Sequence, residues 1–152
     1  MNEICVRAAV AADANDVYRL LRIIADLHRD GRPDVFTGLI SKYTVEEVEA
    51  RLSNEDSGVL VADFKGIVAG YVFCDIIKEG SGKTLYVDDL CVNPEMRHMG
   101  IGKRLMDAAA DYGRRYECSQ LMLNVWEFNH NAVDFYEKYG LKTRSRHMDM
   151  PL

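Results

Sequence analysis

The first part of the chain changes from strand spacing to helical spacing and then loses its apolar pattern. Residues 4–10 read as a strand, and residues 17–27 carry apolar side chains at helical spacing soon after Asp13. This pattern predicts a strand followed by an amphipathic helix that Asp13 caps. The helix cannot continue past the residue before Pro33, so we expect a loop over residues 28–36.

A short helix and a hairpin are predicted next. Thr44 with Glu47 three residues later forms a capping box, which is typical of a helix start. Residues 58–64 and 67–77 have strand patterns and are separated by a tight turn that contains Gly66. Because glycine readily adopts a positive φ, this turn favours an antiparallel hairpin.

The strand expected over residues 85–92 shows a change of phase. Its aliphatic residues alternate up to Val87 and resume the alternation at Leu90, so the pattern slips by one position at Asp88 and Asp89. A β-bulge with one extra residue accounts for this slip, and bulges concentrate beside active sites. A strand that is buried on both faces and has no irregularity is the alternative.

The second half of the chain continues to alternate helices and strands without a repeat or a linker. The elements expected are a helix from near Gly100 to Tyr112, a strand over 120–126, a helix over 131–139 ended by Gly140, and a last strand over 141–150. The unit from Leu85 to Trp126 is expected to be parallel and right-handed. The order predicts one α/β domain over residues 1–152, with a mixed sheet of about six to seven strands and about four helices.

Composition and charge limit the classes of function. The 152 residues are 48% hydrophobic and 28% charged, with a formal net charge of -5, which is typical of a soluble globular protein. The acidic balance argues against wholesale nucleic-acid binding, which needs a basic surface. No stretch approaches the roughly 18 apolar residues of a membrane span, and the N-terminus does not resemble a signal peptide. We therefore expect a cytoplasmic protein.

The four cysteines do not suggest a metal site or a disulfide framework. Cys5, Cys74, Cys91 and Cys118 are widely separated, with no Cys-x-x-Cys pair and no histidine at ligand spacing. Four reduced thiols and no metal are expected.

The segment Arg97-x-x-Gly100-x-Gly102 follows a strand and opens a helix. Free backbone N–H groups and the positive end of the helix dipole converge there, which favours a phosphate ligand. A Walker loop is excluded because Arg104 stands where its hydroxyl residue would be, and a dinucleotide fingerprint is excluded because Leu105 stands at its third glycine. On spacing alone, a plain glycine turn into a helix is an equally good interpretation.

The residues around this loop resemble the acetyl-CoA-binding motif of GNAT N-acetyltransferases. The motif is carried by Leu90-x-Val92-x-Pro94-x-x-Arg97-x-x-Gly100-Ile101-Gly102 with Leu105-Met106, and its second part by Asn129-x-x-Ala132-x-x-x-Tyr136-Glu137-Lys138-x-Gly140. The resemblance covers the C-terminal half closely, and the element order of the other half agrees with it. One position departs from the family pattern, because His98 stands where members commonly carry glycine.

The resemblance implies a GNAT fold, acetyl-CoA as cosubstrate and a set of cofactor contacts. Pantetheine is expected along the backbone of residues 90–92, in an opening between two splayed strands, and the pyrophosphate on the amides of residues 99–103. The expected cofactor-binding residues are Leu90, Cys91, Val92, Arg97, His98, Met99, Gly100, Ile101, Gly102, Lys103, Asn129, Phe135 and Tyr136.

Acetyl transfer needs a neutral amine, an oxyanion stabiliser and an acid for the leaving thiolate. Tyr136 matches the family acid, and a phenol with a pKa of about 10 suits that task, although a core tyrosine is the alternative. A backbone N–H of Leu90 or Cys91 is the expected oxyanion donor. Asp88 or Asp89 is expected to remove the amine proton through a water, or to hold a cationic substrate. Cys91 is interpreted as a packing residue, because no histidine neighbours it and the resembling family transfers directly.

The acceptor is less well specified. The loop after the first helix roofs the acceptor cleft in the resembling fold, and the expected substrate contacts are His28, Arg32, Asp34 and Phe36, with Tyr71 on the floor. Loop scaffolding, with Arg32 paired to Asp34, is the alternative for these residues.

Three functions follow from these residues. The first is acetylation of a small cationic primary amine, which the acidic residues Asp34, Asp88 and Asp89 favour. The second is acetylation of a protein N-terminus or lysine, which needs an open groove. The third is a non-catalytic acyl-CoA sensor. The last strand offers an apolar edge that is expected to pair with or swap into a second subunit, giving a homodimer.

Overall fold

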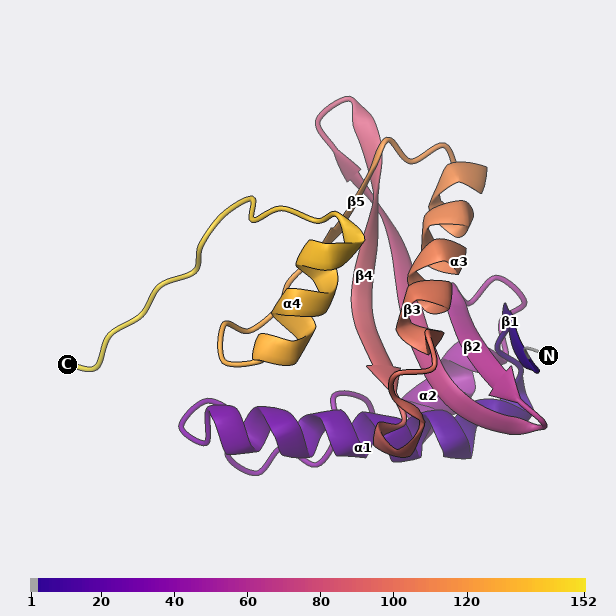
Figure 1. Cartoon of the computed structure of the whole chain (residues 1–152), viewed down its shortest axis with the longest axis horizontal. Helices are drawn as coiled ribbons and strands as arrows, with labels where there is room; N and C mark the ends of the chain where they lie inside the picture. Colours follow the sequence, from indigo (N-terminus) through magenta and orange to yellow (C-terminus); the bar gives the residue numbers. More distant parts are fainter. Residues whose placement is uncertain (1–2) are drawn as a thin grey trace.

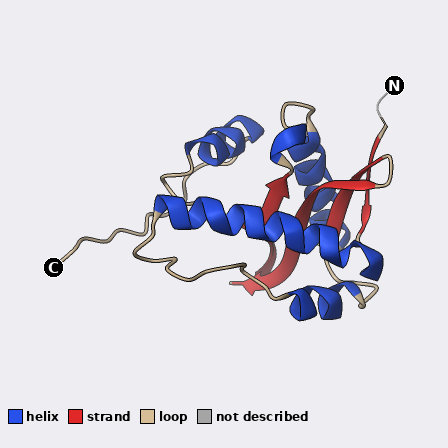
Figure 2. Cartoon of the chain, turned by 90° about the horizontal axis from the view of Figure 1, so that it is seen from below, coloured by secondary structure: helices blue, strands red, loops and turns tan. Residues whose placement is uncertain are grey.

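The fold is a single mixed sheet with helices on both of its faces (Figures 1 and 2). The computed structural model describes residues 3–152. The strands are β1 (Ile4–Ala8), β2 (Val59–Phe64), β3 (Ile67–Glu79), β4 (Gly82–Val92) and β5 (Gln120–Leu123). The helices are α1 (Ala14–Gly31), α2 (Val45–Leu52), α3 (Ile101–Arg115) and α4 (His130–Tyr139). This is the α/β architecture expected from the sequence.

The strands lie in the order β1-β2-β3-β4-β5. The first three pairings are antiparallel, whereas β4 and β5 run parallel. The hairpin between β2 and β3 is confirmed, since Lys65 and Gly66 both have positive φ values, 52° and 83°, as a tight two-residue turn requires. The parallel crossover through α3 is confirmed as well.

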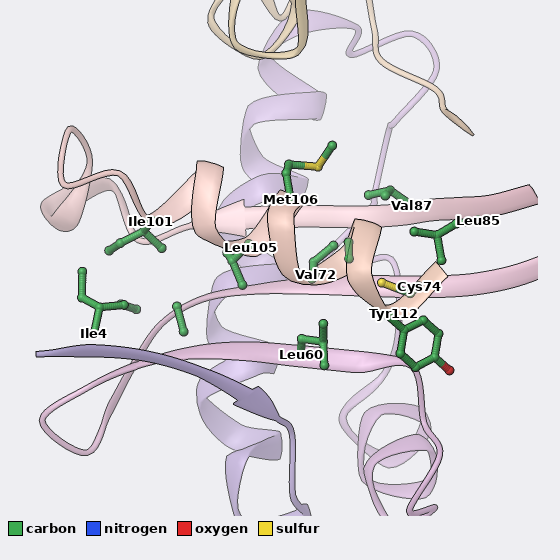
Figure 3. Packing of buried hydrophobic residues seen from close by; sticks show 13 residues of the cluster. Ile4, Leu60, Val72, Cys74, Leu85, Val87, Ile101, Leu105, Met106 and Tyr112 are labelled. Carbon is green, nitrogen blue, oxygen red and sulfur yellow. The ribbon is translucent and has the colours of Figure 1, made fainter. Parts of the chain in front are cut away.

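Two hydrophobic clusters fix the helices to the sheet, one on each face. On one face Leu105, Met106 and Ala109 of α3 are fully buried (Figure 3), and a Cβ on Gly113 would lie 3.1 Å from Leu85, so α3 lies close to β4. On the other face α1 and α2 pack over the sheet through a second cluster. Tyr71 belongs to that second cluster and is fully buried.

The first helix is longer than expected, and its start differs in detail. It runs through Gly31, so residues 28–31, which were expected in a loop, are helical and the loop begins at Arg32. Asp13 holds the N-cap position of α1 but makes no cap hydrogen bond from its side chain. Its carboxylate instead accepts from the Arg7 guanidinium, at 2.8 and 3.0 Å, and from the Val10 amide. A guanidinium with two parallel N–H donors is a stronger partner for a carboxylate than a helix amide.

The C-terminal region corrects the expected strand count. β5 ends at Leu123, three residues before the expected end, and no strand forms over residues 141–150. The sheet therefore has five strands in the described chain, where six to seven were expected. Figure 1 shows the segment after α4 leading away from the sheet. A strand forms only beside a partner, and this segment has none within its own chain.

In the part of the chain that the structure describes, no helix combines the length and the apolar character needed to cross a bilayer.

Candidate active site

The centre of the site is the point where β4 leaves β5. The parallel pairing runs from Thr84 opposite Gln120 to Val87 opposite Leu123 and then stops. β4 continues to Val92, so residues 88–92 have no β5 partner among the described residues. An unpaired strand edge presents backbone N–H and C=O groups that a ligand can bind.

A β-bulge lies at this point, as one of the two interpretations of the sequence proposed. Opposite β4, Phe73 pairs with Asp89 whereas Cys74 pairs with Val87, so Asp88 is the extra residue. After the bulge, the alternation of side chains between the two faces of β4 resumes. Both carboxylates of the acid pair have partners on the α1 face of the sheet, Lys42 for Asp88 and Tyr71 for Asp89.

The glycine loop at the start of α3 has the form of an anion site. Gly100 is the N-cap residue with φ +75°, and His98 also has a positive φ, +67°. Residues 101–103 form the first turn of α3, so their backbone N–H groups have no partner one turn earlier within the helix. Converging free amides at a helix N-terminus are the recognised cradle for a phosphate.

Basic side chains and one close helix contact complete this cradle. Lys103 is paired with Asp107 at 2.9 Å, while the Nη1 atom of Arg104 is buried without a hydrogen-bond partner in the described chain. A Cβ on Gly102 would lie 3.1 Å from the Phe135 ring, so this glycine brings α3 against α4. The loop therefore fits an anionic cofactor and needs both of its glycines, for different reasons.

The residues of α4 border the same region. Asn129 caps the helix by accepting from the Ala132 amide at 3.4 Å, which leaves its amide NH₂ as a donor. The Phe135 and Tyr136 rings pack edge to face. Burial, and then the negative charge of Asp89, raise the pKa of Tyr136 above that of a free phenol. Its hydroxyl therefore stays protonated at neutral pH.

Asp88 and Asp89 lie in different environments. Burial raises the pKa of Asp89 to about 6, against the opposing effects of the Lys42 charge and of the Tyr71 hydroxyl, which donates to it at 3.0 Å. Asp88 is instead engaged by the Lys42 ammonium and the Tyr43 hydroxyl. Tyr71, expected on the substrate floor, is fully buried, and its hydroxyl donates to Asp89.

The comparisons with known proteins agree with this geometry. Residues 21–141 match the model of the acetyltransferase (GNAT) family. The chain belongs to the GNAT family. It is similar to a thialysine N-epsilon-acetyltransferase of Sus scrofa, at 25% identity over 93% of this chain and 86% of the relative. GNAT proteins are acetyl-CoA-dependent N-acetyltransferases, and this chain is one of them.

Solved structures show the same GNAT fold. A Bacillus halodurans protein superposes with a TM-score of 0.84 at 25% identity, over 97% of this chain and 99% of that one. An aminoglycoside acetyltransferase from an uncultured soil metagenomic sample superposes with a TM-score of 0.75 at 17% identity, over 99% and 97% of the two chains. The fold expected from the sequence motifs is thus confirmed.

An aromatic cluster joins the end of α1 and the loop that follows it to the loop after β5. His28 stacks on Phe36 with ring centroids 5.2 Å apart, and Phe36 packs edge to face on Trp126 at 5.2 Å. His28 also meets Phe128. A Cβ on Gly31 would overlap the Phe128 ring, so the end of α1 sits directly against the loop after β5.

The charged residues of the same loop pair with each other and with the C-terminal segment. Arg32 donates two hydrogen bonds to Asp34, at 2.9 and 2.8 Å, and one to Asp149 at 2.7 Å. Arg32 and Asp34 therefore pair with each other, as the alternative interpretation of this loop expected.

Sequence reasoning did not single out four residues that take part in these contacts and in those of Asp88, namely Lys42, Tyr43, Trp126 and Phe128. No local pattern marks the first two, which lie in the segment before α2. The last two lie where a strand end and a loop were expected. Their contacts join segments far apart in the chain.

The two left-handed positions of the cofactor loop yield a test. Gly100→Ala should lower the free energy of unfolding by about 1–2 kcal/mol, because a Cβ at this φ is strained although it would touch nothing within 4 Å. His98→Gly should change it by less than about 1 kcal/mol, since relief of the same strain is offset by a more flexible unfolded chain. Urea unfolding measures the free energy of unfolding of both variants. Equal losses in the two variants would contradict the conclusion that the positive φ at residues 98 and 100 determines the effect.

Proposed function

We propose that this enzyme transfers the acetyl group of acetyl-CoA directly to a primary amine of a small cationic molecule. The observation that carries the proposal is that two side chains, near the point where β4 leaves β5, suit the roles of base and acid. Asp89 is a buried carboxyl whose pKa is raised to about 6. Tyr136 is near enough for that charge to raise its own pKa, so it stays a protonated acid. A base and an acid with such different pKa values are what acyl transfer to an amine requires.

The proposed chemistry uses groups on both sides of the opening. Asp89 accepts a proton from the substrate ammonium through a water, and the neutral nitrogen attacks the thioester carbonyl carbon. A backbone N–H of Leu90 or Cys91, on the β4 segment without a β5 partner, stabilises the oxyanion. The C–S bond then breaks, and the Tyr136 hydroxyl donates its proton to the thiolate. Tyr136 regains a proton from the amide nitrogen as the acetylated product forms.

Direct transfer is preferred over an acetyl-cysteine intermediate. Burial raises the pKa of Cys91 to about 12, so its thiol is protonated at neutral pH and is a poor nucleophile. The sulfur lies on the α1 side, 3.7 Å from the Leu20 carbonyl oxygen. Cys91 is a packing residue in this proposal.

A small acceptor is preferred over a protein. A peptide needs an open groove, whereas here the aromatic cluster joins the loop after α1 to the loop after β5 through Phe36 and Trp126. The similarity to a thialysine N-epsilon-acetyltransferase supports a small amine acceptor as well. The carboxylates at the bulge supply the negative charge that would attract a cationic amine.

Replacement of Tyr136 separates an enzyme from a non-catalytic acyl-CoA sensor. Tyr136→Phe should lower kcat about 100-fold at neutral pH, the scale of a lost general acid, while acetyl-CoA still raises the unfolding temperature as in the wild type. Tyr139→Phe is the matched control, because that hydroxyl donates to Asp107 on α3 and its kcat should stay within about twofold. An unchanged kcat in Tyr136→Phe would remove the acid role, and a wild type that consumes no acetyl-CoA with any amine would favour the sensor.

The role of Asp89 predicts a pH dependence. The base acts only when ionised, so kcat/KM should fall about tenfold per pH unit below its pKa of about 6. Asp89→Asn should lower kcat/KM at least 100-fold and remove the bend near pH 6. Asp111→Asn, which alters an exposed ion pair with Arg114, should keep the bend. An Asp89→Asn enzyme that retains the wild-type pH profile contradicts the assignment.

We also propose that the segment 141–152 pairs with a second copy of the chain. The outer edge of β5 has no strand partner in the described chain, and the segment leads away from the sheet with Met148 and Met150 largely exposed, at 82% and 76%. Its basic residues Lys142 and Arg146 would meet a partner whose overall charge is negative, whereas Arg144 already pairs with Glu79 of its own chain. Reciprocal strand addition to β5 closes a two-fold dimer and covers both edges.

The mass in solution tests this pairing. The full chain should have twice the 17.3 kDa of a monomer, and a chain that ends at Thr143 should be monomeric. A full-length Met148→Asp, Met150→Asp variant should also dissociate, because burying two carboxylates at the new interface is costly. A full chain that stays monomeric at its highest soluble concentration would rule the pairing out.

A further inference from the structure

Lys42 makes an unusual contact at the bulge of β4. Its Nζ atom lies 2.8 Å from the Asp88 carbonyl oxygen and 3.1 Å from the Asp88 Oδ1 atom, although the two residues are 46 positions apart. The same ammonium lies 5.8 Å from the centroid of the Tyr43 ring. A carbonyl, a carboxylate and an aromatic face together form a recognition set for a primary ammonium group.

The Asp88 groups are available because of the bulge. Asp88 is the residue skipped in the register between β3 and β4, and an extra residue of this kind lies outside the regular ladder of hydrogen bonds. Its carboxylate also accepts from the Tyr43 hydroxyl, which fixes its orientation. The subsite is thus built from a backbone irregularity and held by a neighbouring side chain.

The subsite lies beside the proposed base. Asp89 is the next residue. Burial raises its pKa, and the positive charge of Lys42 opposes that rise. Burial lowers the pKa of His28 on α1, and the charge of Lys42 lowers it further. Because consecutive Cα atoms are about 3.8 Å apart, an acceptor with two amines on a short chain can reach both carboxylates.

Lys42 is held weakly enough to be displaced. Its side chain is 43% exposed, although that of Asp88 is only 14% exposed, and it precedes α2 in a segment without regular structure. An ion pair whose ammonium is open to water contributes little to stability. The group at its end is the same as that of a cationic acceptor, a primary ammonium on an alkyl chain.

We propose that the Asp88 carbonyl, the Asp88 carboxylate and the Tyr43 ring form a subsite for a second, non-reacting ammonium of a diamine-type acceptor, and that Lys42 occupies it until the acceptor displaces it. The proposal rests on the proposed function, because Asp89 must face the reacting amine. Lys42 is in this view a competitor of the substrate and sets the preference for acceptors with two amines.

Calorimetric binding tests the subsite without relying on turnover. With CoA present, the wild type should bind 1,4-diaminobutane more tightly than n-butylamine. Lys42→Gln should tighten 1,4-diaminobutane about two- to fivefold, the range expected when an exposed ion pair no longer competes, and should leave n-butylamine unchanged. Lys42→Arg, which keeps the charge, is the matched control and should behave as the wild type. Weaker 1,4-diaminobutane binding in Lys42→Gln would overturn the proposal.

A second variant tests the carboxylate. Asp88→Asn should abolish the preference for 1,4-diaminobutane over n-butylamine while an unchanged unfolding temperature shows that the fold is intact. If the preference persists in Asp88→Asn, or if neither the wild type nor Lys42→Gln binds 1,4-diaminobutane, the subsite is refuted. Acetylation of n-butylamine by the same variant reports separately on the proposed function, because it does not need the second ammonium.

Discussion

The end of the pairing between β4 and β5 is the constraint on which the site depends. Up to Val87 and Leu123 the two strands satisfy each other's backbone groups. Beyond that point the sheet presents an edge in the middle of the molecule, flanked by α3 and α4 on one face and by α1 and α2 on the other. An unpaired edge inside a fold is costly unless something binds it. The pantetheine arm of acetyl-CoA, an extended chain with amide groups, is the ligand that we propose for this edge.

The bulge places two adjacent aspartates in different surroundings. Asp88 is drawn to Lys42 and Tyr43, where it holds a positive charge, whereas Asp89 is buried against the Tyr71 hydroxyl and its pKa rises. The difference arises from their positions in the fold, because both side chains are aspartates. A regular strand would send consecutive side chains to opposite faces. One extra residue keeps both on the α1 side of the sheet and still allows their surroundings to differ.

Local patterns in the sequence predicted the parts of this structure that local forces decide. The capping box at Thr44, the turn at Gly66 and the phase slip at Asp88 each depend on a few neighbouring residues, and each appears in the structure. The early end of β5 and the missing last strand depend on whether a partner strand lies alongside, which periodicity does not report. The partners of Asp88 were also invisible, because Lys42 lies 46 positions away in a segment without a pattern.

The charge of Lys42 connects acceptor binding to the state of the base. A positive charge near Asp89 favours its ionised form, and burial opposes that form. If an acceptor ammonium replaces Lys42 on Asp88, a positive charge stays beside Asp89 throughout the exchange, so the base remains ionised while the acceptor binds. A neutral molecule that displaced Lys42 would remove that charge, and Asp89 would then tend to take up a proton. In the proposed reaction the bulge would therefore favour a cationic acceptor in two ways, through the contact with Asp88 and through the ionisation of Asp89.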